Sequence, residues 1–394
     1  MADLITISGV APIEMVSLPA HLDGQTGSNR AAGNRPQISA NTDVDAVRAW
    51  LARFADTPTT LESYRKEAER LLLWAVIELG KPLSSLMHED LLVYQRFLAD
   101  PQPSGRWVLK SGHKCSRSDP NWRPFAGPLA ATSQRQAMVI LNSMFSWLVS
   151  AGYLAGNPLS LSRQRQRRAK PQVTRFLDEE VWQEVKATIA AMPQETDRDR
   201  EHYYRVRWLI SMLYVCGLRI SEVVQNTMGG FFCRRDKEGE ERWWLEICGK
   251  GSKIRLVPAT QELMVELARY RREYGLASFP VTGEPTPLLL PIGGKPRPLT
   301  RSAVHLIVKE VFMRTASRIR QQGADSERVV SLLEQASAHW LRHTAGSDMA
   351  SADMDIRHIR DNLGHESIST TSRYLHSEDD QRHKDTEGKH RLRW

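Results

Sequence analysis

Three short clusters in the second half of the sequence carry residues that could bind a phosphate group and react with it. The first, CGLRISE at residues 216–222, has a glycine-containing turn before a helical pattern, so Arg219 is predicted to begin a helix. A helix N-terminus attracts anions through its free N–H groups and its dipole. Glu222 follows one turn later and could orient the guanidinium of Arg219. Taken alone, this pattern is more often an ordinary surface Arg–Glu pair.

The second cluster is GKGSKIR at residues 249–255, which the flanking β-prone segments place at the tip of a hairpin. Its glycines would let the backbone approach a ligand closely, and Lys250 would project from the turn. A GKG tripeptide is weak support by itself. It is not a phosphate-binding P-loop, because the GxxxxGK[ST] spacing is absent.

The third cluster is the most specific. It consists of HWLRH at residues 339–343, LGH at residues 363–365, and Tyr374, nine residues after the last histidine of LGH. His339 and Arg342 are three residues apart and would share one face of a helix. A lone histidine in such a place is more often a structural residue. Together with the two earlier clusters, in this order along the chain, the set is hard to obtain by chance.

In these motifs the chain resembles the tyrosine recombinases, or phage integrases. The C-terminal resemblance runs from about Leu177 to Leu375 and includes GLRISE, GKGSKIR, HWLRH, LGH and the terminal tyrosine. The region from about Asp43 to Pro158 is similar to that family's core-binding domain, through far less specific motifs. Matched motif by motif, the resemblance implies six catalytic residues: Arg219, Lys250, His339, Arg342, His365 and the nucleophile Tyr374. All six have the expected residue type, which argues against an inactive relative.

The implied reaction is a transesterification, in which the phenol of Tyr374 attacks a DNA phosphodiester and expels a 5′-alkoxide. Arg219 and Arg342 would each donate two parallel hydrogen bonds to the non-bridging oxygens, where negative charge develops. A free tyrosine has a pKa of about 10, so the phenol must lose its proton during the attack.

The remaining groups would handle protons and hold the phosphate. His339 is the expected acceptor of the phenolic proton, directly or through water, and His365 is expected to bond the scissile phosphate. Lys250 would protonate the leaving 5′-oxygen, for which its pKa must fall below its usual value of about 10.4 or it must act only as charge forms. The 3′-phosphotyrosyl link keeps the phosphodiester energy, so the enzyme should need no cofactor, nucleotide or metal ion.

Helical elements dominate the first half of the chain. Apolar residues recur at helical intervals over 61–75, 84–98 and 132–150, and Thr59 and Glu62 have the spacing of a capping box. These patterns predict a helical domain over residues 41–158, and the resemblance makes it a SAM-like, DNA-binding core-binding domain. A proline- and glycine-rich stretch at 101–128 is expected to be a long loop, longer than in the simplest members of the family. Residues 1–40 are expected to be a flexible arm.

The second half is predicted to be a mainly helical catalytic domain over residues 177–376. Short β-prone runs within 231–257, separated by turn signals, predict a small antiparallel sheet inside it. The fold class is therefore mainly α with a small antiparallel β-sheet, or α+β. The resemblance implies that the core-binding and catalytic domains form a clamp around DNA.

A basic linker is predicted over residues 159–176. Its segment 163–175 holds six Lys/Arg and no acidic residue, and a block of like charge stays extended. It is either a solvated tether or a strap across phosphates, and the two interpretations are about equally supported. The strap would bind DNA through Arg163, Arg165, Arg167, Arg168 and Lys170.

The composition of the chain fits a DNA-acting globular protein without proving it. Of 394 residues, 41% are hydrophobic and 25% charged, and 54 Lys/Arg against 46 Asp/Glu give a net charge of +8. The uncharged segment 136–162 is interrupted by polar residues and is interpreted as a buried helix rather than a membrane span. No secretory signal is recognised, and the expected location is cytoplasmic and nucleoid-associated. A disulfide framework or zinc site is not expected from the scattered cysteines Cys115, Cys216, Cys233 and Cys248.

The expected function is site-specific recombination that integrates or excises a mobile element, with double-stranded DNA as the partner. Type IB topoisomerases use a similar residue set, and resolution of dimers or cointegrates by an Xer-like enzyme is a further alternative. A non-enzymatic DNA-binding protein is disfavoured by the complete set. Exchange of two duplexes needs four cleavages, so a homotetramer is expected on DNA, and a monomer in free solution. The resemblance implies that the tail 377–394 docks in trans, and a loose tail that folds back on its own domain is about equally supported. Accessory recombination proteins are further expected partners.

Overall fold

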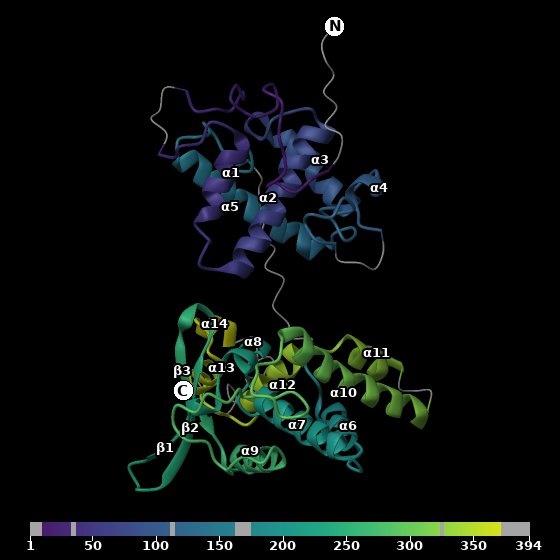
Figure 1. Ribbon diagram of the computed structural model, residues 1–394, viewed down its shortest axis with the longest axis vertical. Helices are drawn as coiled ribbons and strands as arrows, with labels where there is room; N and C mark the ends of the chain where they lie inside the picture. Colours follow the sequence, from purple (N-terminus) through teal and green to yellow (C-terminus); the bar gives the residue numbers. More distant parts are fainter. Residues whose placement is uncertain (1–9, 33–36, 111–114, 162–174, 324–326, 372–394) are drawn as a thin grey trace, which may run out of the picture. The chain divides into compact units, whose positions relative to one another are not determined.

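The computed structural model describes residues 10–32, 37–110, 115–161, 175–323 and 327–371, which form two units (Figure 1). The division falls between Arg167 and Arg168. The fold is mostly helical with one small antiparallel sheet in the described residues, so the predicted fold class is confirmed.

The N-terminal unit is built from helices around α5. Its elements are α1 (Asp43–Ala52), α2 (Pro58–Glu78), the 3₁₀ turn η1 (Leu83–Ser85), α3 (His88–Ala99), α4 (Ser104–Trp107) and α5 (Ala131–Ser150). Helices α1, α2 and α3 all contact α5. Helix α2 begins at Pro58, because the fixed φ of proline suits the first helical position, and Thr57 precedes it as the N-cap. Thr59 therefore lies inside the first turn, and the predicted capping box with Glu62 is wrong.

Helix α5 confirms the prediction of a buried helix in the uncharged segment. Its buried residues recur at helical spacing and include Ile140, Leu141, Met144 and Phe145. Within the described part of the chain, no helix is long and apolar enough to cross a membrane.

The described part of residues 10–40 packs on this unit, which differs from the expected flexible arm. Ile13 is buried in the core, and its backbone N–H donates to Glu69 Oε2 at 2.9 Å. Asn29 bonds both backbone groups of Gly156, donating from Nδ2 to the carbonyl oxygen and accepting from the N–H at Oδ1. The polar composition that suggested disorder instead provides specific hydrogen bonds, and the few apolar anchors are too widely spaced to show a period.

The stretch 101–128 is also anchored, although most of it has no regular structure. Trp107, at the end of the short helix α4, and Phe125 are fully buried. The backbone of Leu109 donates to the carbonyl oxygen of Phe125 at 2.8 Å, and Arg70 Nε donates to that of Pro124 at 2.9 Å. The predicted long loop thus folds back onto α2 through two buried aromatic rings.

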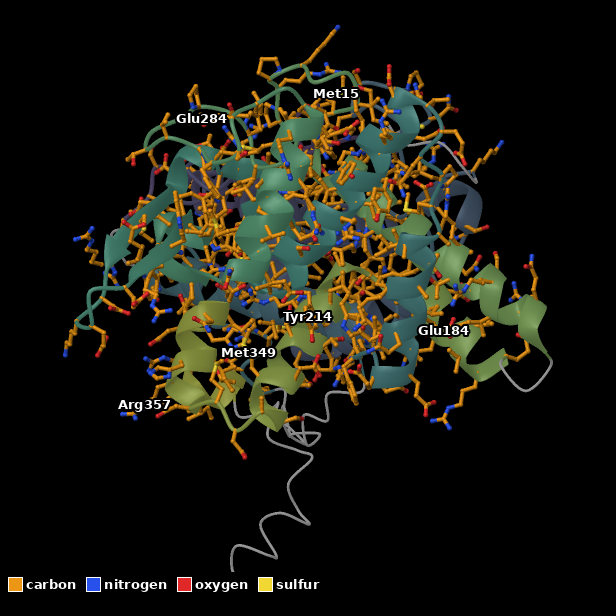
Figure 2. The ribbon with its side chains drawn as sticks, turned by 90° about the horizontal axis from the view of Figure 1, so that it is seen from below. Met15, Glu184, Tyr214, Glu284, Met349 and Arg357 are labelled. Carbon is orange, nitrogen blue, oxygen red and sulfur yellow. The ribbon has the colours of Figure 1, made fainter. Side chains whose placement is uncertain are left out.

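The C-terminal unit has helices around a three-stranded sheet. The helices are α6 (Glu179–Ala190), α7 (Asp197–Tyr214), α8 (Ile220–Gln225), α9 (Gln261–Glu273), α10 (Arg301–Gln322), α11 (Glu327–Gln335), α12 (Ala338–Ser351), α13 (Ile356–Leu363) and α14 (Ile368–Thr371). Helix α7 packs against both α9 and α12. At its end Tyr214 lies beside the α12 residues around Met349 (Figure 2), and its hydroxyl donates to Asp348 Oδ2 at 2.6 Å.

The sheet has the order β1 (Phe231–Arg235), β2 (Glu241–Cys248), β3 (Ile254–Ala259), with both neighbouring pairs antiparallel. The 3₁₀ turn η2 (Met228–Gly230) leads into β1, and η3 (Lys250–Ser252) joins β2 to β3. The predicted hairpin tip at residues 249–251 is therefore confirmed. The Gly249 N–H donates to the Lys253 carbonyl oxygen at 2.8 Å and closes the turn.

The packing of residues 10–32 can be tested with Ile13→Ala. Removing a buried side chain leaves a cavity, so the variant should lower the free energy of unfolding by about 2–5 kcal/mol. Met15→Ala is the matched control, because its side chain lies two residues away and is 62% exposed, against 2% for Ile13. The measurement is denaturant unfolding of the full chain. Equal stability of the two variants would mean that the segment is an arm without a fixed place.

Candidate active site

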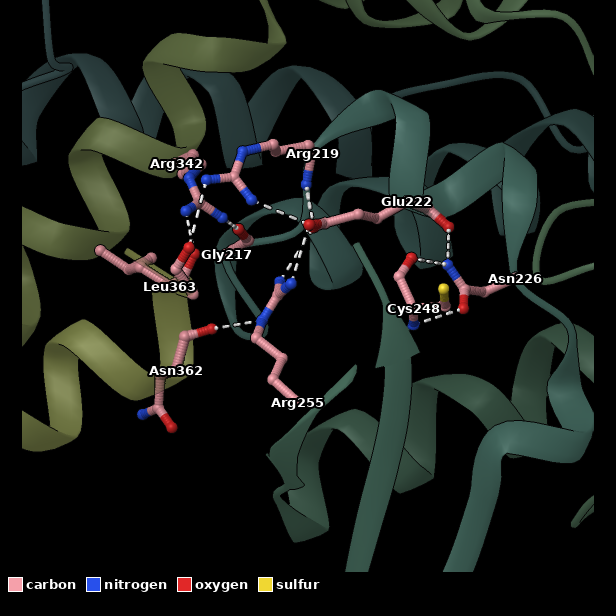
Figure 3. A network of polar contacts seen from close by, with 10 residues as sticks. Gly217, Arg219, Glu222, Asn226, Cys248, Arg255, Arg342, Asn362 and Leu363 are labelled. Atoms are coloured by element: carbon pink, nitrogen blue, oxygen red, sulfur yellow. Dashed lines mark hydrogen bonds and ion pairs between the residues drawn. The ribbon is translucent and has the colours of Figure 1, made fainter. Parts of the chain in front are cut away.

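Arg219 begins helix α8, as predicted, and Glu222 holds it there. The backbone N–H of Arg219 donates to Glu222 Oε2 at 2.8 Å, and its guanidinium NH1 donates to Oε1 at 2.9 Å (Figure 3). The carboxylate is buried, whereas the Arg219 side chain keeps access to solvent. The helix N-terminus is thus capped by an internal carboxylate, and the group that remains presented to an external anion is the guanidinium of Arg219.

Arg342, on helix α12, is the most buried of the predicted catalytic side chains that the structure describes. Its guanidinium donates through NH1 to the Gly217 carbonyl oxygen and through NH2 to the Leu363 carbonyl oxygen (Figure 3). Gly217 lies two residues before Arg219, and Leu363 two residues before His365. Arg342 therefore ties together the two turns that carry these residues.

His365 follows helix α13 in a turn made by Gly364, which has the left-handed φ of +59°. The His365 backbone N–H donates to the Arg360 carbonyl oxygen at 3.0 Å and closes the turn. Its ring Nδ1 lies 3.0 Å from the hydroxyl of Thr371, a fully buried residue at the end of α14. The LGH motif thus supplies a buried anchor, a turn and a histidine with one ring nitrogen already engaged.

His339 lies one turn before Arg342 on α12, so the prediction of a shared helix is confirmed. Its ring is in edge contact with His343, with 4.3 Å between the ring centres. Partial desolvation of this solvent-accessible ring, and the positive charges of Arg342 and Arg219, lower its pKa. The neutral ring is therefore favoured at neutral pH, and a neutral ring can accept a proton.

The same charges act on the other ionisable groups of the site. Burial, with the charges of Arg342 and Arg219, lowers the pKa of His365 to about 4. Burial alone would raise the pKa of Glu222, but hydrogen bonds and charge from Arg255 and Arg219 hold it at about 2. At neutral pH the site therefore contains an ionised carboxylate, neutral imidazoles and a cluster of guanidiniums.

The structure brings together four of the six predicted catalytic residues: Arg219, His339, Arg342 and His365. The backbone of Lys250 lies in η3 at the hairpin tip, and Tyr374 lies outside the described residues. The five candidate DNA-binding residues of the linker also lie outside them: Arg163, Arg165, Arg167, Arg168 and Lys170.

Arg255, on β3, is a member of this network for which the sequence motifs predict no separate role. Its guanidinium donates to both oxygens of Glu222, at 2.7 and 2.9 Å, and its Nε donates to the Asn362 carbonyl oxygen at 3.1 Å (Figure 3). Asn226, after α8, similarly pairs its amide with the backbone of Cys248 at the end of β2. Arg255 stands at the end of the GKGSKIR motif, so the sequence draws attention to it. Its partners Glu222 and Asn362 lie 33 and 107 residues away, so its role could not be predicted from the motif.

Comparison with known proteins places the chain in a family. The profile of the Phage integrase family matches residues 177–381, more than half of the chain. Tyrosine recombinase XerD of Pseudomonas putida is 30% identical over 190 residues, a match covering 48% of this chain and 55% of that protein. XerD of Ralstonia nicotianae is 28% identical over 322 residues, covering 81% of this chain and 91% of that protein.

Solved structures agree in fold. The XerH site-specific recombinase bound to difH substrate, in a pre-cleavage complex, has a TM-score of 0.57 at 16% identity, covering 88% of this chain and 84% of that one. The Tn1549 transposon integrase with transposon right end DNA has a TM-score of 0.57 at 16% identity, covering 88% and 98%. This chain belongs to the phage integrase family and is a tyrosine recombinase, an enzyme of site-specific DNA recombination.

The low pKa of His365 can be measured directly in the free protein. Ring resonances of His365 in NMR spectra should titrate near pH 4, because burial and the neighbouring guanidiniums disfavour the charged ring. The unfolded chain would take up this proton near pH 6.5. Stability contributed by the neutral ring should therefore be complete above pH 6.5 and decline as the pH falls toward 4.

His365→Gln is the variant that isolates this contribution, because a neutral amide replaces the ring. It should reduce the loss of unfolding free energy between pH 7 and pH 4.5, by roughly 1–2 kcal/mol, since solvent screens part of the effect at a partly exposed ring. A titration midpoint of 6 or higher in the wild-type protein would contradict the assignment.

Proposed function

We propose that this recombinase cleaves DNA through Tyr374 and that it integrates or excises a mobile element. The observation that carries the chemical part is the meeting of Arg219, Arg342 and His365 at two turns joined by the Arg342 guanidinium. Such a cluster of fixed hydrogen-bond donors and positive charge suits a phosphate whose oxygens gain negative charge in the transition state.

In the proposed cleavage step, the phenolic oxygen of Tyr374 forms a bond to phosphorus while the bond from phosphorus to the 5′-oxygen breaks. The phenolic proton passes to neutral His339, and Lys250 gives a proton to the leaving oxygen. The products are a 3′-phosphotyrosyl link and a free 5′-hydroxyl. Attack by a 5′-hydroxyl of the partner duplex reverses these transfers and joins the strands.

His365 would bind the scissile phosphate as a neutral donor. Its Nδ1 lies within hydrogen-bond distance of the Thr371 hydroxyl. If this hydroxyl donates to Nδ1, the ring proton is on Nε2, and Nε2–H can donate to a phosphate oxygen. A low pKa favours this neutral form over the imidazolium.

The larger assembly is also a proposal. The helical unit over residues 41–158 would act as the core-binding domain, and it would close with the catalytic domain, residues 177–376, around double-stranded DNA. Four protomers would assemble on two duplexes, with the tail 377–394 docking in trans. The solved XerH and transposon integrase structures contain DNA, which supports a DNA partner for this chain.

A second candidate role is resolution of dimers or cointegrates, which the similarity to XerD proteins favours. The two roles share the cleavage chemistry and differ in the DNA site. Mapping covalent cleavage sites across the surrounding genome separates them: sites at the ends of a mobile element support integration, and a single chromosomal site supports resolution.

The nucleophile is tested with Tyr374→Phe on a nicked suicide substrate that carries the recombination site. Loss of the hydroxyl should abolish the covalent protein–DNA adduct while DNA affinity stays close to that of the wild-type protein. Tyr204→Phe, the same change elsewhere in the C-terminal unit, is the control and should still form the adduct. An adduct formed by the Tyr374→Phe variant would show that another residue attacks.

The wild-type adduct should also form in excess EDTA, because arginines supply the charge stabilisation.

The basic linker is tested by the salt dependence of DNA binding. Changing Arg165, Arg167 and Arg168 to Ala should make the slope of log affinity against log salt less negative, by about 0.9 for each phosphate that the variant no longer neutralises. The matched control changes the same three residues to Lys, which keeps their charge and should keep the slope. An unchanged slope in the Ala variant would identify the linker as a tether only.

A further inference from the structure

Glu222 is shared between two arginines that differ in their access to solvent. Arg255 donates to both carboxylate oxygens, at 2.7 Å to Oε1 and 2.9 Å to Oε2, whereas Arg219 reaches only Oε1 with its side chain, at 2.9 Å. The Glu222 side chain is 1% exposed, that of Arg255 12%, and that of Arg219 35%. The two-point ion pair is thus made by the arginine turned inward, and the one-point pair by the arginine that an external phosphate can reach.

This arrangement decides how much positive charge Arg219 can offer a ligand. If Glu222 faced Arg219 alone, the two charges would cancel, and the carboxylate would draw the guanidinium toward itself. With Arg255 bound at both oxygens, the carboxylate is already neutralised by a buried cation. Arg219 then keeps its charge, and its bonds to Glu222 serve to fix its direction. The effect is large at such a site because a half-buried environment screens charge weakly.

Arg255 also connects two elements that carry proposed catalytic groups. It lies on β3, directly after the hairpin turn of Lys250, and its Nε donates to the Asn362 carbonyl oxygen at the end of α13. Its side chain packs so closely on Gly364 that a Cβ there would lie 2.8 Å from Arg255 Cδ. One side chain therefore joins the hairpin, the Arg219–Glu222 pair and the turn that presents His365.

We propose that Arg255 is a positioning residue for DNA cleavage: it neutralises Glu222, so that Arg219 is available to the scissile phosphate, and it holds the Lys250 hairpin against the His365 turn. This inference rests on the proposed cleavage chemistry. It assigns Arg255 no contact with DNA, since its donors are directed to Glu222 and Asn362.

The test is a double-mutant cycle of Arg255→Gln and Glu222→Gln, measured as the single-turnover rate of adduct formation on the suicide substrate. Arg255→Gln should slow cleavage by about 10- to 100-fold, as expected for residues coupled in one network, with little change in DNA affinity. The double variant should recover most of this loss. Without the Glu222 carboxylate, no negative charge remains for Arg255 to neutralise, and Arg219 keeps its charge. A double variant as slow as Arg255→Gln, or slower, would overturn the charge role.

Two further variants separate positioning from folding. Arg242→Gln is the matched control, because Arg242 lies on β2 of the same sheet, forms an ion pair with Asp236 in the β1–β2 turn and is well exposed. This variant should cleave at the wild-type rate. Arg255→Lys keeps the charge but loses the two-point pairing, so its rate should fall between those of the wild type and Arg255→Gln. If Arg255→Gln does not fold, as judged by thermal unfolding, the comparison of the double variant with Glu222→Gln decides. Rates within about threefold support neutralisation of Glu222 as the main role of Arg255, and a larger further loss overturns it.

A second readout does not depend on covalent chemistry. Inorganic phosphate should bind the free wild-type protein and shift the His365 ring resonances in NMR spectra. Its affinity should fall in Arg255→Gln and recover in the double variant. If the wild-type protein forms no adduct but this pattern of phosphate affinity holds, the cleavage proposal fails and the role of Arg255 stands. Equal phosphate affinity in all variants would overturn the role of Arg255.

Discussion

The geometry of the site in the C-terminal unit depends on two hydrogen bonds that the guanidinium of Arg342 donates. This guanidinium is buried, and it donates to the carbonyl oxygen of Gly217, in the turn between α7 and α8, and to that of Leu363, at the end of α13. A buried cation is stable only when its N–H groups are satisfied, and a buried carbonyl oxygen also needs a donor. The arginine and the two turns therefore stabilise one another, and Arg219 and His365 are placed as a consequence. Loss of Arg342 would leave both turns without their common partner.

Charge is distributed unevenly around this centre. In the part of the site that the structure describes, the guanidiniums of Arg219, Arg255 and Arg342 gather near the carboxylate of Glu222, which pairs with the first two. The surplus of positive charge lowers the pKa of His365, after the larger effect of burial. A bound phosphate would bring negative charge to these cations, and it would raise the pKa of the same ring. The free site is thus prepared for an anion, although its own cations repel one another.

Much of this site could be predicted because its signals are local. The helix start at Arg219 follows from a glycine turn and an acidic residue three positions later, and the LGH turn from a glycine after a helix. Arg255 could not be assigned in this way, because its partners Glu222 and Asn362 come together only through the tertiary fold. The same limit applies to Ile13, whose burial depends on Glu69 and on helices far along the chain. Periodicity identifies a helix face, but it does not identify isolated anchors in an irregular segment.

In the two turns joined by Arg342, the same glycines serve both the local backbone conformation and the tertiary packing. Gly217 has a φ of +57°, and a Cβ on it would lie 2.5 Å from Leu363 Cδ2. Gly364 has a φ of +59°, and a Cβ on it would lie 2.8 Å from Arg255. Each glycine is therefore required twice, by its own backbone conformation and by the element packed against it. A side chain at position 217 would displace the Leu363 side chain, and one at position 364 would displace the Arg255 side chain from its place against the His365 turn. The two glycines thus allow the turn that carries Arg219 and the turn that carries His365 to pack against each other.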